Sequence, residues 1–170
     1  RWMFESGVGM ARESKSGMLL DLWQAWVDLA NFRSFARAAV AGREEAFLAS
    51  VLVPGGVVHP GEFLTIFRSS PDALDDLIAL GNKTRYRSVV PAGLAAFKAQ
   101  RSFALFEKLA DNFTLTLLHP SKRISLGLEP VIAYLLAKEN EIKNLRIILT
   151  GKINKLPAES IRERLRDIYV

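Results

Sequence analysis

The amino-acid sequence predicts an all-α protein, a bundle of helices, from three observations. Apolar residues recur at spacings of three and four positions rather than two, which is the period of a helix. Several segments begin and end with the residues that start and stop helices. The two apolar runs that could form strands, 51–53 and 115–118, lie inside or beside helical patterns, so no sheet is expected.

Two helices are predicted in the first half of the chain. Residues 18–41 contain neither Gly nor Pro and are expected to form one long helix. Ser70 as N-cap, Pro71 at the first helical position and Gly81 just past the last turn predict a short helix over 71–80.

The second half is predicted to contain three more helices, over 94–118, over 130–152 and from Pro157 onward. In the last of these, Ile161, Leu165 and Ile168 are expected to form the apolar stripe. Short segments rich in turn-forming residues connect the helices: Pro54-Gly55-Gly56, Gly81-Asn82, Pro91-Ala92-Gly93 and Pro120-Ser121-Lys122. None of them is long enough to link two domains, so a single domain is expected.

The two long helices are expected to be covered on two sides. At about 100° per residue, one face of the helix over 130–152 carries five large aliphatic residues: Val131, Leu135, Ile142, Leu145 and Leu149. Three more point the opposite way: Ile132, Leu136 and Ile147. The helix over 18–41 has the same arrangement, with Leu22, Trp26 and Leu29 opposite Trp23 and Val27. Such helices lie in the middle of a bundle or at an interface with another chain.

Composition excludes several classes of protein. The chain has 170 residues, 49% hydrophobic and 24% charged, so it is not intrinsically disordered and can bury a core of its own. With no Cys and two His residues, disulfides and metal clusters are disfavoured, and no metal or other cofactor is expected. The net charge of +5 is spread over a whole domain and supports nucleic acid or membrane binding only weakly. No apolar run reaches the ~18–20 residues of a membrane span.

One six-residue pattern occurs twice. Residues 28–33, Asp-Leu-Ala-Asn-Phe-Arg, return at 141–146 as Glu-Ile-Lys-Asn-Leu-Arg, and a Gly follows each helix. Asn is disfavoured inside helices, so its return in the same context indicates an internal duplication. We expect one all-helical domain made of about two pseudo-repeats, over 1–90 and 91–170.

Two interpretations of the polar residues in this pattern stay open. In the first, Asn31 and Asn144 bond to neighbouring helices and fix their register, while Arg33 and Arg146 form ion pairs with other repeat units. In the second, these groups line a concave surface that receives a partner. The residues predicted to take part are Asp28, Asn31, Arg33, Arg37, Glu139, Glu141, Asn144 and Arg146.

The sequence resembles a known family over most of its length. The run over 129–170, EPVIAYLLAKENEIKNLRIILTGKINKLPAESIRERLRDIYV, is similar to the C-terminal segment of the C subunit of the V-type and A-type ATP synthases. The eukaryotic vacuolar ATPase has an equivalent, its d subunit. The stretch over 27–56, VDLANFRSFARAAVAGREEAFLASVLVPGG, resembles the internal copy of the same motif. The resemblance is weakest over 61–120.

This resemblance implies a non-catalytic part of a rotary motor. Members of the family are all-helical, funnel-shaped proteins that cap the membrane ring of proteolipid subunits and hold the end of the central shaft. The resemblance therefore implies these two partners, no enzymatic activity, and a peripheral place at the cytoplasmic face of the membrane, which is contacted only through the ring. Because family members are about twice as long, this chain, which starts without an initiator Met, is expected to lack their N-terminal repeat.

Other chemistry has less support from the residues. Thr150-Gly151-Lys152 lacks the first Gly and the final hydroxyl residue of a phosphate-binding loop. Glu139 and Glu141 diverge on a helix, which disfavours joint acid–base catalysis. The basic clusters at 83–87 and 162–166 leave a nucleic-acid-binding or scaffold module as the alternative function. Acidic residues among the C-terminal arginines favour a solvated or protein-facing helix instead, and we expect no nucleic acid.

Overall fold

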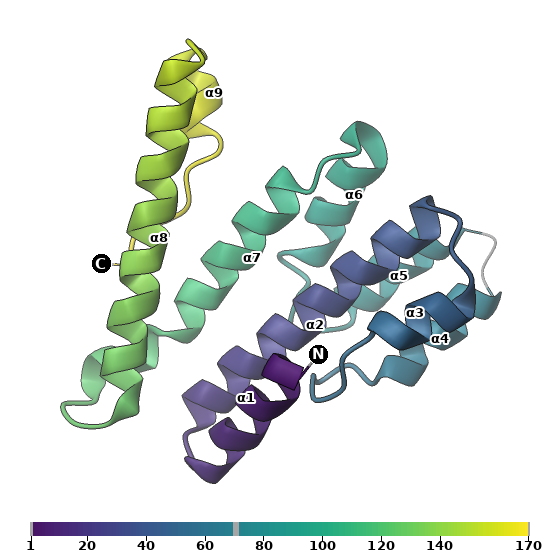
Figure 1. Ribbon diagram of the computed structural model, residues 1–170, viewed down its shortest axis with the longest axis horizontal. Helices are drawn as coiled ribbons and strands as arrows, with labels where there is room; N and C mark the ends of the chain where they lie inside the picture. The colour runs from purple at the N-terminus through teal and green to yellow at the C-terminus, as the bar shows by residue number, and fades with distance from the viewer. Residues whose placement is uncertain (1, 70–71, 170) are drawn as a thin grey trace.

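The computed structural model describes residues 2–69 and 72–169, and within these ranges all regular structure is helical (Figure 1). In order, the elements are α1 (Trp2–Glu13), α2 (Gly17–Val40), α3 (Glu45–Val51), α4 (Pro60–Ser69), α5 (Ala73–Asn82), α6 (Val90–Gln100), α7 (Ala104–Leu117), the 3₁₀ helix η1 (His119–Arg123), α8 (Leu128–Ile153) and α9 (Ala158–Arg162). The all-α prediction is confirmed.

The long helix α2 is enclosed by other elements. It begins where predicted because Ser16 caps it, the Ser16 hydroxyl accepting a hydrogen bond from the amide of Leu19 at 3.3 Å. One side of α2 enters the main hydrophobic core through Phe32 and Phe35, and another packs Val27 against α1. The prediction of cover on two sides is confirmed for this helix.

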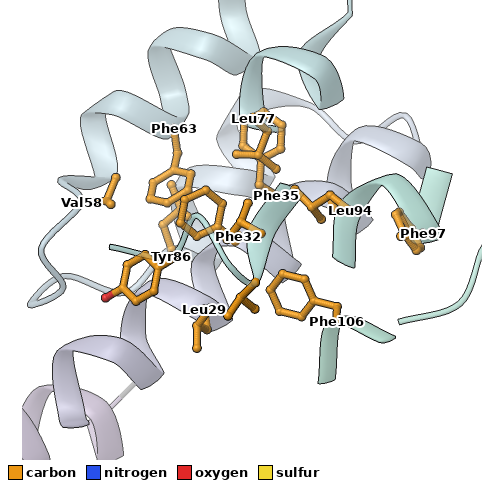
Figure 2. Close-up of a cluster of buried hydrophobic side chains, with 14 of the residues drawn as sticks. Leu29, Phe32, Phe35, Val58, Phe63, Leu77, Tyr86, Leu94, Phe97 and Phe106 are labelled. Atoms are coloured by element: carbon orange, nitrogen blue, oxygen red, sulfur yellow. The ribbon is translucent and has the colours of Figure 1, made fainter. Parts of the chain in front are cut away.

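The main core gathers aromatic side chains from α2, α4 and α7 and from the turn before α6 (Figure 2). Phe32 meets Phe63 edge to face with ring centres 5.1 Å apart, and Tyr86 meets Phe113 with ring centres 5.5 Å apart. Such pairs add ~0.5–1.5 kcal/mol each to the free energy gained from burial alone. The core therefore fixes α4 to α7 against one side of α2.

The single helix predicted over 94–118 is instead two helices, α6 and α7, which fold back on each other. Arg101 adopts the left-handed conformation (φ 55°) and ends α6. Phe103 then stacks on Phe97 with ring centres 4.0 Å apart. Gly93 lies so close to Phe106 that no side chain fits between the two helices there. The prediction was wrong because the reversal depends on packing against a shared core, which local sequence does not encode.

Two boundaries near α5 also differ from the prediction. α5 starts at Ala73, and the predicted N-cap Ser70 and first residue Pro71 lie outside the described residues. It runs through its predicted stop, Gly81, because the missing side chain lets α5 approach the start of α6. Pro91, predicted to lie in a connector, stands in the first turn of α6, where its missing amide donor costs nothing.

In the C-terminal part the prediction holds for α8 but not for the last helix. α8 begins at Leu128 and ends at Ile153, close to the predicted 130–152, but Gly151 lies inside it, buried against Ile161, rather than after it. α9 is a helix of only five residues, and residues 163–169, the described chain beyond it, contain no helix or strand. Leu165 and Ile168 therefore do not extend an apolar stripe, and Ile168 is 68% exposed.

α8 forms one edge of the molecule (Figure 1). A small apolar cluster of Leu22, Leu115, Leu118 and Ala133 ties it to α2 and α7. Its outer face was predicted to be covered, but in the described structure five residues there keep 54–59% of their surface exposed: Val131, Leu135, Ile142, Leu145 and Leu149. Of the two predicted environments, the middle of a bundle is wrong, and an interface with another chain stays open.

Gly93→Ala is expected to lower the free energy of unfolding by about 1–3 kcal/mol, because the added Cβ would overlap Phe106. Gly9→Ala is the matched control. No described atom lies within 4 Å of its added Cβ, and alanine is favoured over glycine in a helix by ~1 kcal/mol. Urea unfolding followed by circular dichroism measures both variants. Equal effects of the two changes would contradict the close packing of α6 on α7.

Candidate interaction site

Two asparagines hold two extended segments in the same way. Asn31 of α2 donates from Nδ2 to the carbonyl of Val53 at 2.8 Å and accepts at Oδ1 from the Val53 amide at 2.9 Å. Asn144 of α8 makes the same pair of bonds with the backbone of Arg166, at 3.0 and 2.9 Å. In both of these asparagine clamps the partner lies 22 residues further along the chain. The partners are extended backbone, not the neighbouring helices that the sequence suggested.

The chain takes the same course between each asparagine and its partner. After α2 or α8 it turns through a left-handed residue, Gly42 (φ 59°) or Lys155 (φ 55°). It then forms the short helix α3 or α9, which buries one aliphatic side chain, and ends in the extended segment. Corresponding residues stand 113 positions apart (144 − 31 and 166 − 53). The repeated sequence pattern thus belongs to two similarly folded segments, 17–53 and 130–166.

Asp28, the acid of the first pattern, is fully buried and accepts three hydrogen bonds. The donors are the Tyr86 hydroxyl (2.6 Å) and the amides of Val57 (2.8 Å) and Val58 (3.2 Å). Gly56 passes so close to the carboxylate that a side chain at this position would overlap it. Burial raises the pKa of Asp28, and the three hydrogen bonds oppose that rise. The pKa of Tyr86 is raised by burial and by the charge of Asp28.

The acid of the second pattern, Glu141, has a different environment. Its side chain is exposed and accepts a hydrogen bond from Lys138 Nζ on the same helix at 2.8 Å. A pair of this kind at the surface contributes little to stability. An acidic residue therefore anchors the following chain only in the first of the two segments.

A groove lies between α1 and α2 on one side and α7 and α8 on the other, with a cavity volume of about 600 Å³. Its lining combines aromatic and aliphatic side chains with charged ones. The residues that line the groove are Met3, Phe4, Trp23, Trp26, Leu29, Ala30, Arg33, Phe106, Glu107, Ala110, Asp111, Thr114, Glu139, Lys143 and Arg166.

Ion pairs within the groove join its walls. Arg33 Nη1 lies 3.3 Å from Glu107 Oε1 and links α2 to α7. Asp111 of α7 receives two cations, Lys143 Nζ at 3.0 Å and Arg166 Nε at 2.9 Å. The Arg166 side chain is only 14% exposed, so water screens this pair less than it screens a surface pair. One carboxylate therefore ties α7 both to α8 and to the C-terminal segment.

The remaining predicted residues are separated from one another. Arg37 lies outside the groove, with its guanidinium 5.0 Å from the centre of the Phe103 ring. Glu139 lines the groove together with Arg33. Arg146 is exposed and forms no ion pair with a described residue.

Sequence reasoning missed three residues that matter here. Tyr86 was placed in a basic cluster that could follow phosphates, but it is fully buried with its hydroxyl on Asp28, so it cannot stack on bases. Asp111 belongs to no recognisable pattern. Asn140 donates to a backbone carbonyl of the C-terminal segment at 2.6 Å. Its position four residues before Asn144, on the same helix face, was the signal that could have found it.

Within the described ranges no group of three or more His, Cys, Asp or Glu side chains is placed to hold a metal ion. In the same ranges, no helix combines the length and the apolar character that crossing a membrane requires.

Asp28→Ala is expected to lower the free energy of unfolding by about 2–4 kcal/mol, because it leaves buried backbone amides and the Tyr86 hydroxyl without an acceptor. Glu141→Ala, the corresponding change in the second pattern, is the control and is expected to stay within ~0.5 kcal/mol. Urea unfolding measures both. Similar losses in the two variants would show that burial does not distinguish the two acids.

Tyr86→Phe is expected to cost about 1–2 kcal/mol near neutral pH and less at acidic pH. Folding raises the pKa of Asp28 above its ordinary value of 3.8, so the folded state favours the protonated carboxyl. The stability that Asp28 adds in this way is fully present below pH 3.8 and is lost as pH rises through the raised pKa. In Tyr86→Phe the hydrogen bond to the Asp28 carboxylate is lost, and the pKa of Asp28 rises further. The variant therefore loses the most stability at a pH where Asp28 is ionised. Unfolding free energies across this pH range test the difference, with exposed Tyr134→Phe as control. A cost that does not change with pH would contradict the assignment.

The chain matches the family model described as ATP synthase (C/AC39) subunit over residues 2–164. It is similar to the C subunit of the V-type sodium ATPase of Enterococcus hirae, at 26% identity over 151 residues, which cover 89% of this chain and 44% of that protein. It is also similar to the C subunit of the A-type ATP synthase of Methanobrevibacter smithii, at 32% identity over 130 residues, which cover 74% of this chain and 33% of that protein.

The chain thus spans less than half the length of these relatives. No solved structure gives a significant match. The family model nevertheless extends from the first described helix to just beyond α9 and takes in Asn31, Asn144 and all but one residue of the groove. On this match, the chain belongs to the ATP synthase (C/AC39) subunit family.

Proposed function

We propose that this chain is part of the non-catalytic subunit that joins the central shaft of a V-type or A-type rotary ATPase to its membrane ring of proteolipid subunits. The family match over residues 2–164 carries the proposal. In this role the subunit transmits torque between ATP turnover and ion transport and catalyses no reaction itself. It lies at the cytoplasmic face of the membrane and contacts it only through the ring.

The groove is the surface that we propose receives the end of the shaft. Its partly exposed aromatic side chains, Phe4, Trp23 and Trp26, offer the large contact area that protein interfaces favour. Charges of both signs stand among them, which suits the orientation of a polar partner. A volume of about 600 Å³ accommodates several side chains, so the tip of a helix or a loop fits better than a whole helix.

The walls of the groove are braced in a way that suits a load-bearing part. Arg33 and Glu107 join α2 to α7, and Asp111 joins α7 to α8 and to Arg166. Asn144 then fixes the backbone of Arg166 to α8. A force applied to one wall is therefore carried by polar contacts to the other helices as well as by apolar packing.

We also propose that the chain consists of two pseudo-repeats, over about 1–90 and 91–170. The constant offset between the two asparagine clamps supports this division. In this arrangement Asp28, Asn31 and Asn144 serve packing within each repeat, and Arg33 pairs between the repeats. The predicted residues that remain for contacts with other subunits are Arg37, Glu139, Glu141 and Arg146.

Ala30→Arg, which places a long charged side chain in the groove, is expected to reduce recovery of the shaft subunit in co-purification at least about tenfold. Ala95→Arg makes the same change at an exposed position of α6 and is expected to have no effect. Quantitative mass spectrometry of the purified complexes measures both, and circular dichroism confirms that both variants fold.

Equal recovery of the shaft by the two variants would rule out the groove as the shaft site. If the unmodified chain recovers neither shaft nor ring while the complex is intact, the rotor role itself is wrong. Binding to nucleic acid that falls steeply with added salt would then favour the alternative function.

A further inference from the structure

A small inner cavity of about 50 Å³ adjoins the groove. Of its other lining residues, three are leucines of the small apolar cluster and the fourth is Asn140. About 10–15 Å³ of such space suffices for one water-sized group, so the inner cavity can take the end of a single side chain. The residues that it shares with the groove are Trp26, Asp111, Thr114, Glu139 and Lys143.

Asn140 brings an acceptor without a partner to the inner cavity. The residue is only 4% exposed, and its Nδ2 donates to the carbonyl of Asp167 at 2.6 Å, which fixes the orientation of the amide. Its Oδ1 is buried and accepts no hydrogen bond from any described residue. Among the described side chains it is the one buried polar atom in this position. Because buried polar groups are nearly all paired in proteins, this oxygen calls for a donor.

The other polar groups of the inner cavity also leave acceptors open. Glu139 is exposed and forms no ion pair with a described residue. The Thr114 hydroxyl already donates to the carbonyl of Asp111 at 2.8 Å, so it can only accept from a further group. The carboxylate of Asp111, in contrast, already pairs with Lys143 and Arg166. The inner cavity therefore lacks donors and one positive charge.

A lysine ammonium supplies both. It carries one positive charge, three donors and no acceptor, so it can bond to Asn140 Oδ1, Glu139 and Thr114 together. It is compact, which suits the small volume better than the wider planar fork of an arginine. Trp26 belongs to both the groove and the inner cavity, and the indole face is the aromatic surface that attracts cations most strongly. The leucines match the aliphatic stem of a lysine.

We propose that the inner cavity is a lysine pocket, which takes the ammonium of a lysine at the tip of the protein that occupies the groove. Exposed Glu139 attracts this lysine, and buried Asn140 Oδ1 accepts a hydrogen bond from its inner end. The inference rests on the proposed function, which puts the end of the shaft in the groove. It adds the chemistry by which that tip is recognised.

The reactivity of the shaft subunit's lysines toward acetic anhydride tests the proposal. Mass spectrometry measures the acetylation rate of each lysine in the free shaft subunit and in its complex with the full chain. One lysine is expected to react at least about tenfold more slowly in the complex, because its ammonium is enclosed. With Glu139→Gln, this protection is expected to fall about fivefold.

Calorimetric titration of the shaft subunit into the full chain gives the matching affinities. Glu139→Gln is expected to weaken binding about fivefold. Glu13→Gln, at an exposed position of α1 outside the groove and the inner cavity, makes the same change in net charge and is expected to have no effect.

A double-mutant cycle tests the role of Asn140. Replacing the protected lysine of the shaft by alanine is expected to weaken binding at least about threefold less in Asn140→Ala than in the unmodified chain. The cycle cancels any effect of Asn140→Ala on the fold that does not depend on the lysine, and circular dichroism shows whether the variant keeps its helical content.

The possible failures are distinguishable. If Ala30→Arg prevents shaft binding but Glu139→Gln changes neither affinity nor protection, the groove stands as the shaft site and the lysine pocket is overturned. A complex in which every shaft lysine reacts as it does in the free subunit overturns it as well, and Asn140 Oδ1 then bonds to water only. If Ala30→Arg leaves shaft binding intact, the groove is not the shaft site, and the lysine pocket fails with it.

Discussion

Residues 53–58 cross α2 with Val53 and Val58 buried, so the backbone groups of this segment that face α2 need partners inside the protein. A buried amide or carbonyl without one costs ~1–3 kcal/mol. Asn31 satisfies both groups of Val53, and Asp28 accepts from the amides of Val57 and Val58. Once this segment is fixed, the start of α4 is fixed as well, and with it the entry of Phe63 into the core. The arrangement of the first half of the molecule depends on these two polar side chains.

The second half repeats only part of this device. Asn144 holds the backbone of Arg166 as Asn31 holds Val53, but Glu141 is exposed and anchors no following segment. The two long helices also differ in how much of their surface is buried. α2 is enclosed by the main core, whereas α8 lies at the edge and is joined to its neighbours by a small apolar cluster and by the ion pairs of Asp111. Two similar segments thus differ both in one polar anchor and in how far their long helix is enclosed.

The helices with strong local signals were the ones that sequence could predict. α2 was found from periodicity and from the absence of Gly and Pro within 18–41, α8 was found from its helical pattern over 130–152, and the repeated pattern pointed to Asn31 and Asn144. The reversal between α6 and α7 and the extended chain after α9 could not be predicted, because tertiary packing decides them. Neither could the partners of Asp28 and Asp111, which lie far away in sequence. Tyr86 shows the limit most clearly, since its basic neighbours suggested an exposed site and its actual place is set by a buried carboxylate.

Because α2 is enclosed by the core and α8 lies at the edge, the two helices are expected to differ in how easily a force displaces them. A helix enclosed on several sides, like α2, can bend only if the whole core deforms, and close-packed interiors resist that strongly. A helix held by a smaller apolar cluster and by a few polar contacts, like α8, can move with less deformation of the core. In the proposed rotor role, such a helix would store elastic energy when torque rises and return it when the load falls, while the region around α2 keeps its shape.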